Sequence, residues 1–424
     1  MEKIFYDQLD ETLLRAKLPN GLTVHIVPRK DFSKKLAYFV TDFGAIHTEF
    51  EFEGQTHSMP AGIAHYLEHT LFHMPDHRDI SAEFAALGAI TNAFTSYDMT
   101  AYYFSCTENF ESCLKLLLEF VSTPYFTPES VEKEQGIIAQ EIGMYQDSPD
   151  SRVFENLVGA MYTEHPIRIP ILGTVESIGQ ITPEKLQLCH RAFYTPGNMH
   201  LCVMGDVQPE EVIALARQVL GDQSSEVAQK HNLWREPLAC PTGYTEDRME
   251  VAMPMFSLAF KCPPAPRGEA GVREDMVAEL AAEALFGDAS ELYLRLYEAG
   301  IIDSSFGGGF ETLDGAALFT CSGDSDQPEE IRRQILVQTE KLIRQGIDEE
   351  EFARLRRSAL GRRIRGLDSF DATCFRLCAY RFTDYDYFQF PEVYRSIRWE
   401  DVADFLKRTV LEENSSLSVI LPNS

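Results

Sequence analysis

Two spacings of apolar residues alternate along this chain, one typical of helices and one typical of strands. Helical spacing covers residues 62–72 and 109–121, where apolar side chains return every third or fourth position. Thr-Pro-Glu at 127–129 and again at 182–184 predicts two further helix starts, with Thr as N-cap, Pro at the first helical position and Glu in the positive first turn. Short apolar runs that predict strands lie at 22–27, 36–40, 102–105 and 201–207.

The second half of the chain repeats the first half in a weaker form. Phe-Ser-Cys at 104–106 matches Phe-Thr-Cys at 319–321, and Thr-Leu-Phe at 70–72 resembles Ala-Leu-Phe at 284–286. The two offsets, 215 and 214 residues, are nearly equal, and self-similarity of this kind indicates an internal duplication. The alternative is a chance likeness between two successions of strands and helices.

A polar stretch at residues 222–241 has the composition of a loop and marks the expected boundary between the two copies. We therefore predict two tandem domains, at residues 1–221 and 242–424, with a linker at 222–241. The length of 424 residues agrees with a chain of two or three domains.

The charge balance is strongly acidic, with 66 acidic and 38 basic side chains and a formal net charge of −28. Nucleic-acid binding needs clustered Lys and Arg to contact phosphates, so this balance argues against it. Docking on an anionic membrane is disfavoured for the same reason, and no run of 18 apolar residues predicts a membrane span. A basic peptide is a better partner for an acidic surface.

Nine cysteines are spread over the chain without a CxxC pair, and most of them lie in apolar segments. This usage is typical of buried, reduced thiols in a cytosolic protein. The first residues are acidic and lack the apolar core and the cleavage site of a secretory signal. We therefore expect a cytoplasmic protein.

The most informative residues are His65-Tyr-Leu-Glu68-His69. On a helix, His65 and His69 lie one turn apart on the same face, so both imidazoles can bind one metal ion. Glu68 lies at the edge of that face, where its carboxylate can take a proton from a metal-bound water that attacks a carbonyl. This order of residues is the inverted form of the HExxH zinc motif. The alternative is a helix that holds two histidines and a glutamate by chance.

A catalytic zinc site needs a third protein ligand and leaves a fourth position for water. The helix expected after residue 127 carries Glu134 and Glu141, two turns apart on one face. Surface helices often carry such pairs, so the spacing alone leaves an ordinary exposed helix as the alternative. His73 and His77 continue the histidine spacing, but Pro75 interrupts a helix there. We therefore predict a helix end or loop at these two residues, not metal ligands.

Together these residues resemble the pitrilysin/insulinase family of metallopeptidases, which includes the mitochondrial processing peptidase subunits. His65, Glu68 and His69 match the family's HxxEH motif. Glu141 matches its distal glutamate ligand, and Glu134 matches the acidic residue seven positions before that ligand. The other segments that carry the resemblance lie at 88–95, 98–102, 165–174 and 194–206.

The resemblance is dense over residues 15–210 and weaker, though collinear, over 245–424, and the short bacterial members are the most similar. It implies an α+β fold of two tandem homologous domains, each a mostly antiparallel sheet with helices packed on one face. It also implies that only the first domain binds metal. At the offset of 214, the second copy has Glu279, Ala282 and Glu283 in place of the motif, and an arginine-rich helix at 354–365.

For the site, the resemblance implies one Zn²⁺ per chain, bound by His65, His69 and Glu141. It implies Glu68 as the general base and Glu134 as a further residue that supports catalysis from behind the ligands.

The resemblance also implies how substrate is held, as a strand added to the sheet edge at Asn92, Ala93, Phe94 and Thr95. Main-chain hydrogen bonds would then provide affinity with little demand on the peptide's sequence. Without the resemblance, an edge strand covered by other parts of the chain is an equally good interpretation.

One departure concerns the second domain, where the family usually supplies an Arg and a Tyr, seven positions apart, that contact substrate near the scissile carbonyl. Here Arg295 is offset by one position, and Asp303 stands where the Tyr is expected. Stabilisation of the oxyanion by that pair is therefore not predicted. Arg376, Tyr380 and Arg381 are candidates to replace it, as are groups from a partner subunit.

The sequence thus predicts a cytoplasmic zinc endopeptidase that cleaves peptides or unfolded segments, basic ones by preference, inside a closed chamber. A chain of this length supplies half of the family's clamshell, so a homodimer or a heterodimer with a metal-free paralogue is expected. The rival hypothesis is a non-catalytic or partner-dependent peptide-binding subunit of a heterodimeric processing complex. A structural zinc protein is a poorer alternative, because structural sites are usually closed by four protein ligands.

Overall fold

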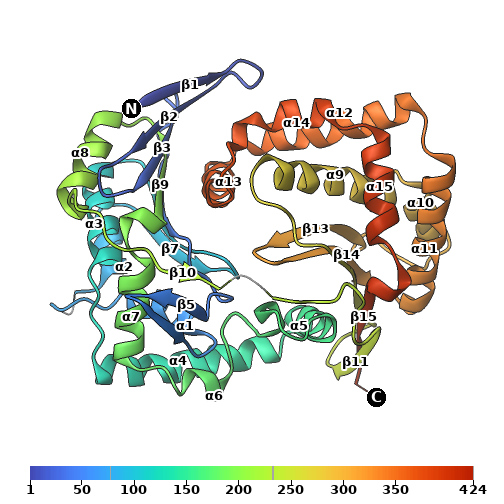
Figure 1. Ribbon diagram of the computed structural model, residues 1–424, viewed down its shortest axis with the longest axis horizontal. Coiled ribbons are helices and arrows are strands. Elements are labelled where there is room, and N and C mark those ends of the chain that lie inside the picture. Colours follow the sequence, from blue (N-terminus) through green and yellow to red (C-terminus); the bar gives the residue numbers. More distant parts are fainter. Residues whose placement is uncertain (77, 232–233, 424) are drawn as a thin grey trace. The chain divides into compact units, whose positions relative to one another are not determined.

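The computed structural model describes residues 1–76, 78–231 and 234–423 of the chain, so His77 lies outside the described residues. The chain divides into two compact units (Figure 1). The first contains residues 1–142, 170–231 and 364–388, and the second contains the rest. Each unit has a mostly antiparallel sheet with helices packed on it, which confirms the predicted α+β fold with two related domains.

The first unit is built on a seven-stranded sheet. In spatial order its strands are β1 (Glu2–Tyr6), β2 (Glu11–Lys17), β3 (Thr23–Pro28), β9 (Met199–Gly205), β4 (Lys35–Thr41), β8 (Thr100–Cys106) and β7 (Ile90–Thr95). Only the β3–β9 pair is parallel. The central strands are buried along nearly their whole length, which explains why they read as continuous apolar runs rather than as an alternating pattern.

Helices cover this sheet and form the core of the first unit with it. They are α1 (Ile63–Thr70), α2 (Ile80–Ala86), α3 (Phe110–Ser122), α4 (Pro128–Gln146), α6 (Val175–Ile178), α7 (Pro183–Phe193) and α8 (Pro209–Leu220), whereas α13 (Phe370–Phe382) packs on the sheet outside this core. A small sheet, β10 (Gln229–Lys230), β5 (Glu49–Phe52) and β6 (Gln55–Ser58), completes the unit. Both Thr-Pro-Glu starts are confirmed, because Thr127 and Thr182 each accept a hydrogen bond from the backbone N–H three residues later.

The second unit is built on a five-stranded sheet. Its strands, in spatial order, are β11 (Tyr244–Met249), β15 (Ser415–Pro422), β12 (Met255–Cys262), β14 (Ala316–Asp324) and β13 (Gly307–Leu313), and only β11–β15 is parallel. Its helices are α5 (Pro149–Met161), α9 (Glu269–Phe286), α10 (Glu291–Glu298), α11 (Pro328–Gln345), α12 (Glu349–Gly366), α14 (Phe390–Ser396) and α15 (Trp399–Thr409).

Two helices are exchanged between the halves of the chain, because each packs in the unit that is built mainly from the other half. Helix α5 comes from the first half but packs in the second unit, where Arg152 pairs with Asp247 at 3.0 Å. Helix α13 comes from the second half but packs on β9 and β4 of the first unit, where Asp371 pairs with Lys34 at 2.9 Å. Each follows a long helix and starts with a serine N-cap. That residues 222–241 form the linker between the two copies stays a prediction.

Helix α13 lies on the face of the seven-stranded sheet that is opposite to the main core. Leu201 and Val203 of β9 point into that core, and neighbouring side chains on a strand point the other way. His200 accordingly lies beside Phe382 of α13, with ring centroids 6.4 Å apart. Throughout the described ranges, every helix is too short or too polar to cross a membrane.

Candidate metal centre

Helix α1 carries the HxxEH motif, and two glycines at a close backbone approach fix where the helix begins. Its N-cap is Gly62, whose φ is 88°, and a Cβ at this residue would lie 2.4 Å from the carbonyl oxygen of Leu172. Gly173 has the same arrangement: its φ is 73°, and a Cβ on it would clash with the carbonyl oxygen of Ala61 at 2.5 Å. Only glycine fits a crowded, left-handed backbone of this kind. The contact therefore sets the start of α1 and the positions of its side chains.

Helices α1 and α4 bring His65, His69 and Glu141 together. The hydroxyl of Tyr66 donates a hydrogen bond to the carbonyl of Val131, which holds α1 against α4. Glu141 Oε2 lies 3.7 Å from His65 Nε2 and 3.4 Å from His69 Nε2. One ligand atom from each of the three side chains lies within 4.8 Å of the other two. Two imidazole nitrogens and one carboxylate oxygen form a zinc donor set that leaves the fourth position open, so the residues present fit this ion.

Glu134 lies behind this trio and faces two histidines. Its Oε2 is 3.5 Å from His69 Nδ1, and its Oε1 is 2.9 Å from His73 Nε2. Burial alone would raise the pKa of Glu134, but His69 and His73 outweigh that effect and lower the pKa to about 2. An ionised carboxylate next to the second nitrogen of a ligating imidazole fixes the orientation and the tautomer of the ring.

Glu68 is buried beside the trio and is held from the neighbouring sheet. Its Oε2 accepts a hydrogen bond of 2.6 Å from the hydroxyl of Thr95 on β7. Burial raises the pKa of the Glu68 carboxyl, and the Thr95 hydrogen bond and His69 act in the opposite direction. A carboxyl of this kind, one residue from a ligating histidine, is well placed to exchange a proton with a bound water.

Burial also controls the protonation of the histidines. It lowers the pKa of His65 to about 3, with a smaller contribution from the nearby His69. In His69, burial again lowers the pKa, but Glu134, Glu68 and Glu141 together raise it above its usual value. His65 is therefore neutral at physiological pH, which is the form that binds metal.

The predicted substrate edge is strand β7, the last strand in the order of its sheet. Its side chains point to two faces. Thr95 turns toward Glu68 of α1, whereas Phe94 lies on the other face with its ring 5.9 Å from that of Phe375 on α13. Asn92 is exposed, and its Oδ1 accepts a hydrogen bond from the backbone N–H of Ala93. That a peptide pairs with this edge stays a prediction.

The offset Arg295, and Arg376 and Tyr380 among the suggested replacements for the Arg–Tyr pair, have contacts of their own. Arg295 lies in the second unit, where its guanidinium contacts Gln334 and Gln338. Arg376 and Tyr380 lie on α13, where both pack on the ring of Tyr387. A contact between any of them and substrate stays a prediction.

Two roles in this site were not foreseen from the sequence. The sequence predicts a helix end or loop at His73. This residue does lie beyond the end of α1, but its side chain forms a hydrogen bond with Glu134. The four-residue spacing of His65, His69 and His73 could have indicated this contact, but Pro75 argues against a helix that continues through His73. Thr95 was expected to act through its main chain at the edge, whereas its side chain contacts Glu68.

Comparison with protein families gives matches to both halves of the chain. Residues 55–175 match the family model described as insulinase (peptidase family M16), and residues 180–359 match the one described as peptidase M16 inactive domain. A curated relative, the uncharacterised zinc protease YmfH of Bacillus subtilis, is 36% identical over the whole length of both chains.

Solved structures agree with this match. An M16-like peptidase from Alicyclobacillus acidocaldarius superposes with a TM-score of 0.93 at 33% identity, covering 97% of this chain and 99% of the other. Pitrilysin superposes with a TM-score of 0.80 at 16% identity, covering all of this chain but 46% of its own, which shows a shared fold.

Proposed function

The chain belongs to the M16 insulinase family of zinc proteases, and we propose that it is a zinc-dependent endopeptidase that cleaves peptides or unfolded segments. One observation carries the proposal. His65, His69 and Glu141 converge within 4.8 Å, and the buried carboxylate of Glu68 lies beside them. A site with three protein ligands and a neighbouring base suits hydrolysis better than a structural role, which usually takes four ligands.

His65, His69 and Glu141 would hold the zinc ion, which when bound would supply Lewis-acid chemistry to the scissile carbonyl and to the attacking water. Glu68 accepts the proton of that water on a carboxylate oxygen and returns it to the leaving amine. Glu134 keeps the imidazole of His69 in place.

The peptide is proposed to lie along β7 as an added strand, held by main-chain hydrogen bonds within a closed chamber. Because such bonds do not depend on side chains, the net charge of −28 is the feature that would favour basic peptides. Since the chain covers 46% of the pitrilysin chain, we propose that a second chain, identical or metal-free, completes the chamber. The cytoplasm stays the predicted compartment.

A second candidate function is a peptide-binding subunit that needs a partner for catalysis. Asp303, which stands where the family's tyrosine is expected, accepts a hydrogen bond of 2.7 Å from the backbone N–H of Ser305. A carboxylate only accepts hydrogen bonds, so it cannot stabilise an oxyanion as a phenol would. This feature favours a chain whose activity depends on groups from another subunit.

The deciding experiment measures zinc content and cleavage of a quenched peptide library for the wild type and for Glu68→Gln. We expect one zinc per chain in both proteins, and cleavage by the wild type that falls by at least about 100-fold in the variant. Glu311→Gln, on β13 of the second unit, is the matched control and should behave as the wild type. Full activity in Glu68→Gln would contradict its assignment as general base. A zinc-loaded wild type that cleaves nothing, even with a partner present, supports the second candidate.

A further inference from the structure

The general base lies on a side chain that its own helix does not fix. A glutamate has several rotatable bonds, and holding it in one arrangement costs conformational entropy that some contact must offset. For Glu68 that contact comes from another element, through the 2.6 Å hydrogen bond donated by Thr95 on β7. This distance is typical of a hydroxyl that donates to an ionised carboxylate, which is among the stronger hydrogen bonds in proteins.

Thr95 is itself held in place by the hairpin to which it belongs. Its main chain pairs with Thr100 on β8, and the turn that joins the two strands closes with a 2.8 Å hydrogen bond from the N–H of Ser96 to the carbonyl of Met99. A threonine has one side-chain torsion, which a strand restricts further. The oxygen that faces Glu68 therefore has a fixed position relative to the sheet.

Counting protons gives the direction of the hydrogen bond. Thr100 Oγ1 lies 2.8 Å from the carbonyl of Phe43, which accepts its single proton. Its distance to the Thr95 hydroxyl is 3.5 Å, so that second contact is weak. An ionised carboxylate has no proton to donate, so the Thr95 hydroxyl is the donor to Glu68.

From these contacts we propose that Thr95 is a positioning residue, which holds the Glu68 carboxylate toward the site where the metal-bound water attacks. One residue then has two roles, because the main chain of β7 is the proposed peptide edge while the side chain of Thr95 orients the base. Alignment of the peptide and alignment of the base are thus set by the same strand. The inference rests on the proposed peptidase function and adds a residue to it.

The test compares Thr95→Val, which keeps the shape and the strand preference but loses the hydroxyl, with Thr95→Ser, which keeps the hydroxyl. We expect Thr95→Val to lower kcat by about 10- to 100-fold, with KM and zinc content unchanged. Thr95→Ser should stay within about threefold of the wild type. Thr312→Val, the same change on the exposed edge strand β13 of the second unit, is the matched control and should leave kcat, KM and zinc content unchanged.

A double-mutant cycle then separates positioning from substrate binding. If Thr95 acts through Glu68, Thr95→Val costs no further activity in the Glu68→Gln background. Unchanged kcat in Thr95→Val, an effect confined to KM, or equal losses in Thr95→Val and Thr95→Ser would each overturn the proposal.

The role of Thr95 can also be tested without measuring cleavage, so that its failure is distinguishable from failure of the proposed peptidase function. Crystal structures of the zinc-loaded wild type and Thr95→Val should show Glu68 in a single rotamer in the first and displaced in the second. A wild type that binds zinc and cleaves nothing would refute the peptidase function, and the rotamer of Glu68 would still decide the role of Thr95. An unchanged Glu68 in the variant structure overturns it.

Discussion

The two units place corresponding helices together but line the space between them with different side chains. In the first unit, α1 and α4 present His65, His69 and Glu141, a donor set for a metal ion. In the second unit, α9 and α12 hold their charges in ion pairs, with Arg362 2.6 Å from Glu283 and Arg363 2.8 Å from Glu279. The second unit thus carries its positive charge on side chains.

Positions on α4 and α12 can be matched by counting from the N-cap of each helix. Thr127 caps α4 and Asp348 caps α12, each by accepting a hydrogen bond from the backbone N–H three residues later. Glu141 follows its cap by 14 positions, and Arg362 follows its own cap by the same 14. The contact between His69 and Glu141 in the first unit is therefore matched by the ion pair of Glu283 with Arg362, with the signs of charge reversed.

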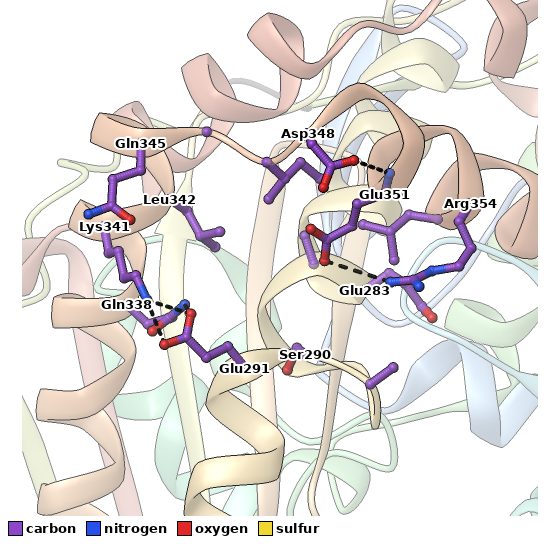
Figure 2. A pocket seen from close by; sticks show the side chains of 15 residues that line it. Glu283, Ser290, Glu291, Gln338, Lys341, Leu342, Gln345, Asp348, Glu351 and Arg354 are labelled. Atoms are coloured by element: carbon purple, nitrogen blue, oxygen red, sulfur yellow. Dashed lines mark hydrogen bonds and ion pairs between the residues drawn. The ribbon is translucent and has the colours of Figure 1, made fainter.

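A polar pocket of about 260 Å³ lies next to this ion pair, and Glu283 forms part of its wall (Figure 2). Its acidic side chains already have partners. Glu291 pairs with Lys341 at 2.5 Å, and Glu351 lies 3.8 Å from Arg354 (Figure 2). Among the described residues, no trio of His, Cys, Asp or Glu in this unit brings its ligand atoms as close as the trio of the first unit.

The comparison teaches that one helix framework serves two purposes. Arginine keeps its charge at any physiological pH and satisfies acidic neighbours permanently, so the second unit needs no ion. Neutral histidines and an ionised glutamate are instead groups that a metal ion can bind, and three such ligands leave a fourth coordination position open.

The largest expected effect comes from removing corresponding residues in the two units. His69→Ala deletes a ligand, so zinc should be lost and cleavage should fall by at least about 100-fold. Glu283→Ala, at the matching position, breaks a partly exposed ion pair and should cost no more than about 1 kcal/mol of stability. Zinc content, cleavage rate and urea unfolding of both variants check this, and zinc loss in Glu283→Ala would contradict the correspondence.

A smaller effect is expected from Arg363→Met in the second unit. The Arg363 side chain is 6% exposed and contacts both Asp275 and Glu279, each 27% exposed. Its removal takes away the ion pairs of 3.0 Å to Asp275 and 2.8 Å to Glu279, so we expect a loss of about 2–3 kcal/mol, below the range for fully buried pairs because the acids retain some water. Urea unfolding measures the loss. Arg354→Met is the control, since the Arg354 side chain is 64% exposed and should contribute little.

Acid should destabilise the two units to different extents. In the first unit, His25 and His200 are buried between the sheet and α13, and no described residue forms a hydrogen bond with their ring nitrogens. Burial, helped by Arg381 and Arg15, lowers the pKa of His25 to about 3, and burial lowers that of His200 as well. The unfolded chain binds these protons near pH 6.5 and the folded chain does not, so stability should fall as pH drops from 6.5 toward 3.

The second unit also has a buried histidine whose pKa is lowered by burial, His165, and in addition a carboxyl that titrates in a lower window. Burial alone would raise the pKa of Glu236, but hydrogen bonds from the N–H groups of His165 and Glu164 and from Lys261 lower it to about 2. This contribution is present above pH 4.5 and is lost as pH falls toward 2. The first unit, with the pair His25 and His200, should therefore lose more stability below pH 6.5 than the second unit with His165, by up to about 1.4 kcal/mol per pH unit for each histidine.

Unfolding of zinc-free protein between pH 7.5 and 4.5 measures this effect, and His25→Leu should flatten the slope by the share of one histidine. Equal slopes in the wild type and the variant would show that His25 takes up its proton in the folded state.

Contacts within one helix could be predicted from the sequence, whereas contacts between elements far apart in the sequence could not. Spacing placed His65 and His69 on one helix face and Glu134 and Glu141 on another, because helix periodicity decides which side chains share a face, and the family resemblance then assigned the two glutamates to the same site. Thr95 and Glu68 are 27 residues apart on different elements, and no spacing rule links a strand to a helix over that distance. The link between His73 and Glu134 spans 61 residues and escaped for the same reason.

The alternation of helices and strands, the internal repeat and the HxxEH motif could be identified from the sequence, since periodicity, caps and local motifs are properties of neighbouring residues, and the α+β class followed from the family resemblance that these motifs carry. Only the tertiary structure decided that α5 and α13 pack in the unit that the other half mainly builds, that Thr95 holds Glu68, and that arginines occupy the corresponding place in the second unit. These depend on which buried surfaces meet, and burial, unlike periodicity, is a property of the whole folded chain.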